Sequence, residues 1–292
     1  MINTFRQLRI RRSIQYPIKI AAICDGLIPS VELCIVQPLR YLTDRHKIQH
    51  EIYFEGRSLP IEEMKGYDII LVMRSCASET LLAVQELKHS AKIIFMADDN
   101  IIAALDEFPP ENAIRRHYEH LNARHNFPAL MQCSDVVVVF SRAMRDDFQS
   151  IAKRIVVAPA ISGIELSGIE DADASHVRAG TELRLGYAGS STHQHDVSLL
   201  GDSLPRLLQE IPNLFVESID QKLNNISGHP RYRHLEAVKG LDQFFRLLQS
   251  RKWDLGLSPC AKINLIGPRQ TTNIDLMRRS VFLVFIRIER PL

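Results

Sequence analysis

The chain has 292 residues, of which 46% are hydrophobic and 24% are charged, and its formal net charge is +2. This length accommodates two domains with cores of their own, and the near balance of charge argues against a dedicated nucleic-acid-binding protein. Five scattered cysteines without a CxxC pair are typical of reduced thiols, and no run approaches the roughly 20 apolar residues that span a bilayer. These properties predict a cytoplasmic protein.

Residues 1–17 form a basic leader. Four arginines lie in it, and no acidic residue precedes Asp25. Two interpretations stay open for this segment. It is either a solvated leader or a patch that is weakly attracted to an anionic membrane surface, which would make the protein membrane-associated.

Apolar strand-like runs alternate with helix-like segments from residue 18 to residue 160. Such alternation is typical of a parallel sheet covered by helices on both faces, that is, of a doubly wound Rossmann-like domain. Pro38 should kink or delay the first helix, and Ser141 is placed to cap the last one. The expected strands are 18–25, 50–56, 67–74, 91–100, 134–141 and 154–160, and the expected helices are 31–46, 78–89, 112–132 and 141–152.

Residues 161–182 break this alternation. They are small, polar and acidic, which suits a linker. The alternation resumes in residues 183–292, which predict a second, partial Rossmann-like domain. Its expected strands are 183–188, 213–219 and 253–259, and its expected helices are 195–210 and 241–252. The predicted fold class is therefore α/β, with two Rossmann-like domains of which the second is incomplete.

A loop of small residues follows the first strand of the second half. Backbone N–H groups are free between a strand and a helix start, and the helix dipole favours negative charge there. The loop therefore predicts an anion site that grips phosphate, although a solvated loop histidine is an equal alternative for its last residue. Its members are Gly189, Ser190, Ser191, Thr192 and His193.

Polar residues also close the strands of the first half. Gly26 either lets a ligand approach the backbone or belongs to an ordinary Asp-Gly turn. Arg74 either holds a phosphate or carboxylate or is a surface arginine. Asp98 and Asp99 either hold sugar hydroxyls, act as a base or bind a metal, or they cap a helix.

Three histidines lie in the segment HYEHLNARH, residues 117–125. Their spacings of three and five lack the HExxH register of a zinc site. A polar helix face is the interpretation that this segment favours.

Several segments resemble the family four-like glycosyltransferases, also called glycosyl transferases group 1, which have the GT-B fold. LRLGYAGSSTHQHDVSLL resembles their "IGYMGSPTHxxDL" segment, and WDLGLSPC resembles "WDIGLAPL". YDIILVMRS, IIFMADDN, SDVVVVFSRAM and IVVAPAISG resemble further segments of the family in the same order, so that the likeness covers roughly residues 18–277. The resemblance implies that a sugar moves from a nucleotide-diphosphate sugar to an acceptor hydroxyl with retained anomeric configuration.

The resemblance also implies roles for individual residues. The donor would lie between the domains, mainly on the second, against Gly189 and the loop that follows it. Pro259, Thr271 and Asn273 would complete the donor site. The acceptor, a glycan or a lipid-linked sugar, would contact Gly26 and Arg74, with Asp98 and Asp99 as catalytic residues. The resemblance implies neither a metal nor a further cofactor.

The C-terminal part departs from the family. The two lysines of the family fall on Thr271 and Asp275 of this chain, no glutamate follows to hold the donor ribose or sugar, and the tail RRSVFLVFIRIERPL at 278–292 matches no expected segment. A truncated or frame-shifted product is favoured over a divergent protein completed by a partner.

Two alternatives to a glycosyltransferase remain. One is a nucleotide-sugar epimerase, which would need acids and histidines facing the sugar. The other is a non-catalytic pseudo-glycosyltransferase that binds a partner or a glycan.

Overall fold

The computed structural model describes residues 17–45, 48–158, 182–189, 197–198 and 200–257. They fall into two compact units, which we call unit 1 (residues 17–158) and unit 2 (residues 182–257). The expected leader, the linker and the C-terminal tail lie outside the described residues, as does most of the expected anion loop.

Unit 1 is built on a six-stranded parallel sheet with the strand order β2-β1-β3-β4-β5-β6. The inner strands β1, β3, β4 and β5 are largely apolar, as expected for a sheet buried on both faces, whereas the edge strand β2, IQHEIYF, carries polar and exposed residues. The strands are β1 (Ile18–Cys24), β2 (Ile48–Phe54), β3 (Ile69–Met73), β4 (Lys92–Ala97), β5 (Val136–Val139) and β6 (Ile155–Val157).

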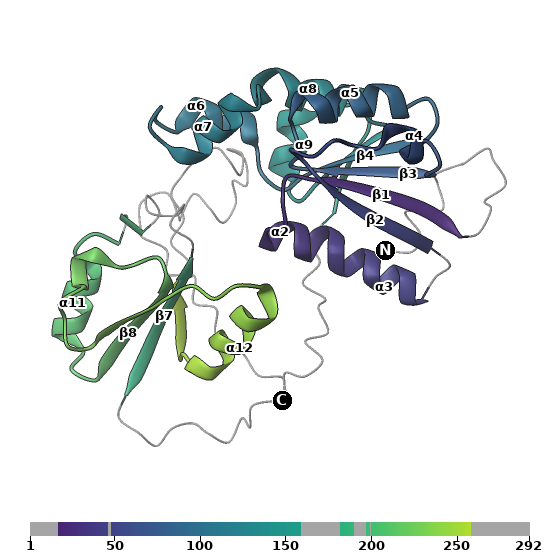
Figure 1. Ribbon diagram of the computed structural model, residues 1–292. Coiled ribbons are helices and arrows are strands. Elements are labelled where there is room, and N and C mark those ends of the chain that lie inside the picture. Colours follow the sequence, from purple (N-terminus) through teal and green to yellow (C-terminus); the bar gives the residue numbers. More distant parts are fainter. Residues whose placement is uncertain (1–16, 46–47, 159–181, 190–196, 199, 258–292) are drawn as a thin grey trace. The chain divides into compact units, whose positions relative to one another are not determined.

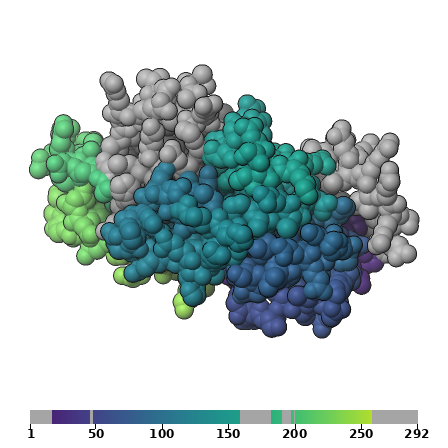
Figure 2. Space-filling model, turned by 90° about the horizontal axis from the view of Figure 1, so that it is seen from above, coloured from purple at the N-terminus to yellow at the C-terminus, as the bar shows by residue number. Residues whose placement is uncertain are grey.

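Helices cover both faces of this sheet (Figure 1). Alternate residues of β1 point to opposite faces, so Ile23 packs in the core below α5 and α8, whereas Ala22 packs against α2 and α3. In Figure 2, the described residues of unit 1, coloured purple to teal, form one continuous surface in the view from above. The helices are α2 (Pro29–Val31), α3 (Gln37–Arg45), α4 (Ile61–Met64), α5 (Ser78–Leu87), α6 (Ile101–Glu107), α7 (Ala113–His120), α8 (Ala123–Cys133) and α9 (Arg142–Phe148).

The structure explains how the first helix accommodates Pro38. A π-helical stretch, Glu32–Val36, joins α2 to α3, and the N–H of Gln37 bonds to the carbonyl of Glu32. Pro38 has no N–H to donate to the helix. The wider π-helical hydrogen bonding immediately before it accommodates this interruption of the α-helical hydrogen bonds. The proline therefore sits at the start of α3 and changes the local helix type.

Two other helical predictions can be compared with the structure. Residues 112–132 form two helices, because Asn122 adopts a left-handed conformation with φ 53° between α7 and α8. The predicted cap of α9 is confirmed, since the side chain of Ser141 accepts a hydrogen bond from the N–H of Met144 at 3.1 Å. The sequence analysis did not predict α6, whose start Asn100 caps in the same way.

Unit 2 holds a four-stranded parallel sheet with the order β10-β7-β8-β9. Its core lies between this sheet and α11 (Ser203–Glu210), where Leu204 and Leu208 are buried. The strands are β7 (Leu183–Gly189), β8 (Leu214–Asp220), β9 (Tyr232–Leu235) and β10 (Leu255–Leu257), and a further helix is α12 (Leu241–Arg251). The fold class is thus α/β with two parallel sheets, of which the second is smaller.

Two further properties concern the described residues only. None of their helices is both long and apolar enough to cross a membrane. Four of the cysteines fall within them, and all four are free thiols: Cys24, Cys34, Cys76 and Cys133.

Candidate functional site

The strand order of unit 1 reverses between β1 and β3. The chain runs outward from β1 to β2 on one side and from β3 to β6 on the other. In open α/β sheets, ligands bind beyond the carboxyl ends of the strands at such a switch point, because the two connections leave in opposite directions and open a crevice. Asp25 follows β1 directly and Arg74 follows β3 directly, so both lie at this edge.

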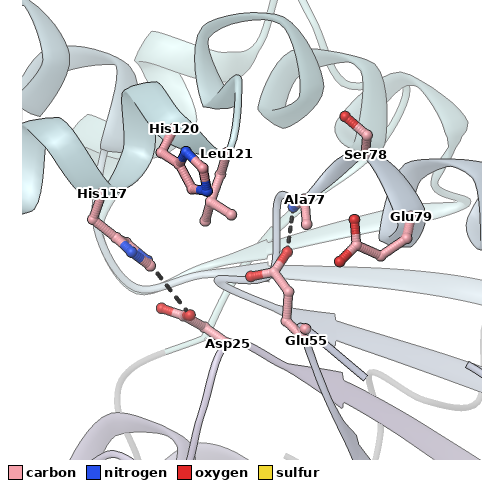
Figure 3. A pocket seen from close by; sticks show the side chains of 9 residues that line it. Asp25, Glu55, Ala77, Ser78, Glu79, His117, His120 and Leu121 are labelled. Atoms are coloured by element: carbon pink, nitrogen blue, oxygen red, sulfur yellow. Dashed lines mark hydrogen bonds and ion pairs between the residues drawn. The ribbon is translucent and has the colours of Figure 1, made fainter. Parts of the chain in front are cut away.

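A pocket of about 410 Å³ opens at the same edge. Asp25 enters from the end of β1, Glu55 from the end of β2, and Glu79 from the start of α5, while the two histidines of α7 come from the opposite side (Figure 3). No lysine or arginine is found among the described lining residues. These are Asp25, Glu55, Gly56, Ala77, Ser78, Glu79, His117, His120 and Leu121.

Asp25 and His117 form the central pair of the pocket. The Nε2 atom of His117 lies 3.6 Å from Oδ1 of Asp25. The aspartate side chain is 20% exposed, whereas that of the histidine is 48% exposed. A carboxylate close to an imidazole is an arrangement that general bases use.

Glu55 is held at the wall of this pocket. One carboxylate oxygen accepts a hydrogen bond from the N–H of Ala77, and burial raises the pKa of the carboxyl group above its ordinary value. The other oxygen, Oε2, is buried and has no hydrogen-bond partner. A carboxyl group with a raised pKa at the wall of a pocket is suited to exchange a proton with a ligand.

Arg74, Asp98 and Asp99 come together beside the pocket. One guanidinium nitrogen, Nη1, donates to Oδ2 of Asp98 at 2.9 Å and to Oδ2 of Asp99 at 2.8 Å. The other, Nη2, donates to the hydroxyl of Tyr118 at 2.8 Å. The three residues therefore bond to one another, although Nε of Arg74 and Oδ1 of Asp98 are buried without a partner, and none of the three lines the pocket.

Gly26 lies in a turn, since its carbonyl accepts a hydrogen bond from the N–H of Ile28 at 3.0 Å. A Cβ atom added at Gly26 would meet no atom within 4 Å. The described packing therefore does not require glycine at this position. The geometry agrees with the turn interpretation and leaves the backbone there open to approach.

Of the expected donor residues, only Gly189 lies within the described part of the chain. It ends β7, and the strand order of unit 2 reverses between β7 and β10, so it stands at the switch point of that sheet. A Cβ atom at Gly189 would clash with the ring of Tyr187, whose Cζ would be only 2.7 Å away. A larger residue at this position would therefore require the hydroxyl end of Tyr187 to shift, independently of any ligand. The remaining residues lie outside the described part: Ser190, Ser191, Thr192, His193, Pro259, Thr271 and Asn273.

None of the nine described lining residues is among the site residues predicted from the sequence, and five of the nine carry titratable side chains: Asp25, Glu55, Glu79, His117 and His120. Glu55 follows β2 directly, so the strand-end rule applied to β2 would have found it. The histidines had been assigned to a polar helix face, and only the position of α7 above the strand ends brings them to the pocket. Among the described residues, no cluster of three or more His, Cys, Asp or Glu is arranged to hold a metal ion.

Comparisons with known proteins identify the fold. No family model matches the chain, and no curated protein matches its sequence. A UDP-bound MnaA from S. aureus matches with a TM-score of 0.51 and 12% identity over 82% of this chain and 73% of its own. UDP-GlcNAc 2-epimerase from Neisseria meningitidis bound to UDP-GlcNAc matches with a TM-score of 0.50 and 11% identity over 84% and 78%.

A glycosyltransferase gives a similar score. The catalytic domain of starch synthase IV from Arabidopsis thaliana, bound to ADP and acarbose, matches with a TM-score of 0.50 and 9% identity over 85% of this chain and 80% of its own. The chain therefore shares GT-B-like Rossmann domains with nucleotide-sugar epimerases and with glycosyltransferases. At such low identities the similarity describes the fold and does not distinguish the two activities.

Proposed function

We propose that this protein is a glycosyltransferase that moves a sugar from a nucleotide-diphosphate sugar to an acceptor hydroxyl bound in the pocket of unit 1. The observation that carries the proposal is the Asp25–His117 pair at the switch point of the sheet, 3.6 Å apart and open to solvent. The similarity in fold to enzymes whose structures hold UDP, UDP-GlcNAc or ADP supports a nucleotide-sugar donor.

The proposed chemistry assigns one proton transfer to this pair. The acceptor oxygen forms a bond to the anomeric carbon as the bond from that carbon to the diphosphate oxygen breaks, and the electron pair leaves with the diphosphate. His117 takes the acceptor proton, and the carboxylate of Asp25 stabilises the resulting imidazolium. Asp98 and Asp99 support the reaction through Arg74, and the donor diphosphate binds to the segment that begins at Gly189.

The first experiment asks whether transfer occurs. The protein is incubated with UDP-GlcNAc and a panel of saccharide acceptors, and mass spectrometry detects acceptors heavier by one N-acetylhexosamine. A base that deprotonates the acceptor suits direct displacement with inversion, whereas the family resemblance implies retention, so the anomeric coupling constant of the product is also recorded. A folded sample that neither binds nor consumes UDP-, GDP- or ADP-sugars would refute the proposal.

Three variants test the pair itself. His117→Ala and Asp25→Asn are expected to lower kcat about 100-fold or more, because a positioned acid or base contributes roughly 10²–10⁴-fold. His125→Ala is the matched control, since His125 belongs to the same histidine-rich segment, is exposed and does not line the pocket. It should leave kcat unchanged.

A second candidate is a nucleotide-sugar epimerase. The observation that favours it is the presence of further acid–base groups, Glu55 and Glu79, in the same pocket as Asp25 and His117. Epimerisation removes a carbon-bound proton and returns one to the opposite face, which requires such groups around one carbon. Incubation with UDP-GlcNAc in D₂O without an acceptor distinguishes the candidates, because only an epimerase gives an isomeric product that carries deuterium at the inverted carbon.

A further inference from the structure

Arg74 links three elements of unit 1 at the edge of the sheet. It follows β3, it bonds to Asp98 and Asp99 after β4, and it bonds to Tyr118 on α7. The side chains of Arg74 and Asp98 are only 17% and 12% exposed, and Tyr118 is 3% exposed. The side chain of Asp99 is 49% exposed, but the bonds from Arg74 to Asp98 and Tyr118 are shielded from water and are held more rigidly than an ion pair on the surface.

The backbone of Arg74 is also unusual. Its φ angle is 58°, in the left-handed region that residues other than glycine rarely adopt. Such a conformation persists only where the surrounding contacts determine it, and it is concentrated at functional sites. Here the three hydrogen bonds of the guanidinium group supply those contacts.

The cluster reaches the proposed catalytic pair through one residue. Tyr118 is next to His117 on α7, and their rings meet edge to face with 5.1 Å between centroids. The same histidine lies 3.6 Å from Asp25 at the end of β1. The bond from Arg74 to the tyrosine hydroxyl therefore fixes the segment that carries His117 relative to the strand ends.

We infer that Arg74 is a positioning residue, which holds α7 over the edge of the sheet so that His117 faces Asp25. The inference rests on the proposed function of this pair. It gives Arg74 a role different from the binding of a substrate anion, because two aspartates and a tyrosine already bond to Nη1 and Nη2 of its guanidinium group and the remaining Nε is buried. Asp98 and Asp99 contribute to the same positioning, since they follow β4 and accept hydrogen bonds from the guanidinium group.

The test uses Tyr118→Phe, Arg74→Lys and Arg74→Gly in the full chain. Tyr118→Phe keeps the ring packing and removes only the hydroxyl that Arg74 contacts. Arg74→Gly removes the guanidinium and relieves the left-handed backbone at once. Arg74→Lys keeps the positive charge but lacks the planar guanidinium group with its several N–H donors. Arg124→Ala is the matched control, because Arg124 contacts a single aspartate, Asp106, at a surface where both side chains are 58% exposed.

The primary readout is the imidazole signals of His117 in long-range ¹H–¹⁵N spectra of histidine-labelled protein, assigned with His117→Ala. Tyr118→Phe and Arg74→Gly should shift these signals and lower kcat about 10- to 100-fold with little change in the KM of the acceptor, since a small misplacement of a catalytic group acts on the chemical step. Compared with Arg74→Gly, Arg74→Lys should restore part of the wild-type signal positions and part of kcat. The control should change neither.

Two outcomes have distinct meanings. Signals of His117 that stay unchanged in Tyr118→Phe and Arg74→Gly would overturn the positioning role, even if the melting temperature fell. Signals that move as expected in a protein that transfers no sugar would keep the positioning role and refute the proposed function. Tyr118→Phe preserves the test if Arg74→Gly does not fold.

Discussion

The buried ion pair of unit 2 allows one prediction to be worked out in full. The side chain of Glu217 on β8 is 8% exposed, and it accepts hydrogen bonds from Nε and Nη2 of Arg251 and from Nε1 of Trp253. Burial opposes the ionisation of Glu217, but the bonds from Arg251 and Trp253 outweigh it and hold the pKa of the carboxyl group below its ordinary value of 4.5. The pair attaches the end of α12 to the sheet.

Replacement of Arg251 by methionine leaves this carboxylate buried with one hydrogen-bond donor. Breaking a buried pair from one side costs about 3–5 kcal/mol, and we expect about 3 kcal/mol here because Arg251 keeps 17% of its side-chain surface exposed. The double variant Glu217→Gln/Arg251→Met removes the stranded charge and should recover most of the loss. Arg206→Met is the control on α11, where both side chains of the Arg206–Glu210 pair are exposed and less than about 0.5 kcal/mol is expected.

Urea unfolding followed by tryptophan fluorescence measures these differences. The chain contains one tryptophan, Trp253, which lies in the cluster, so the signal reports on unit 2. Because the pKa of Glu217 is lowered on folding, the stability that the pair contributes is present above pH 4.5 and is lost as the pH falls through the folded-state value. The gap between the wild type and Arg251→Met should therefore shrink in acid. A difference of less than about 1 kcal/mol at pH 7 between the free energies of unfolding of the wild type and Arg251→Met would refute this reasoning. A double variant no more stable than Arg251→Met would also refute it.

Three further predictions concern other positions. Glu55→Gln should raise the melting temperature at pH 7 and lower activity. Because burial raises the pKa of Glu55 in the folded state, the gain in stability should grow as the pH rises above 4.5 and vanish in acid. A gain in stability that is independent of pH would contradict the burial argument. Gly186→Ala should destabilise unit 2 by about 1–3 kcal/mol, because the added Cβ would overlap the indole of Trp253, and a neutral result in urea unfolding would show that the indole moves freely. Ser141→Ala should cost about 1 kcal/mol through loss of the cap bond to Met144, with Ser141→Thr, which keeps a hydroxyl, as the control in calorimetry.

The sequence predicted the architecture because the strands carry their own signal. In a parallel sheet buried on both faces, continuous apolar runs such as Ile69–Met73 are conspicuous, and loops interrupt them regularly. The strand β9, Tyr232–Leu235, was missed because its sequence YRHL has no apolar alternation, and it forms by pairing with β8 at the edge of the sheet. Tertiary pairing outweighs local preference there.

The candidate site was predicted only in part, and the reason is geometric. Rules about strand ends point to residues such as Arg74 and Asp98, because their place follows from the strand that precedes them. These rules do not say which side chains of other elements reach the same edge of the sheet. His117 lies 92 positions from Asp25, and only the placement of α7 brings the two together. The sequence thus located the edge of the sheet but not the residues that reach it from α7.

The distribution of unpaired polar atoms separates the site from ordinary structure. In the part of the chain that is described, three buried side-chain atoms lack a hydrogen-bond partner: Oε2 of Glu55, Nε of Arg74 and Oδ1 of Asp98. All three belong to residues just beyond β2, β3 and β4, at the carboxyl edge of one sheet. The buried carboxylate of Glu217 in unit 2, by contrast, has both oxygens satisfied. Stability alone disfavours buried atoms without partners. Their concentration at one edge of the sheet distinguishes this edge from the satisfied ion pair of unit 2, and it is at this edge that we propose the acceptor to bind.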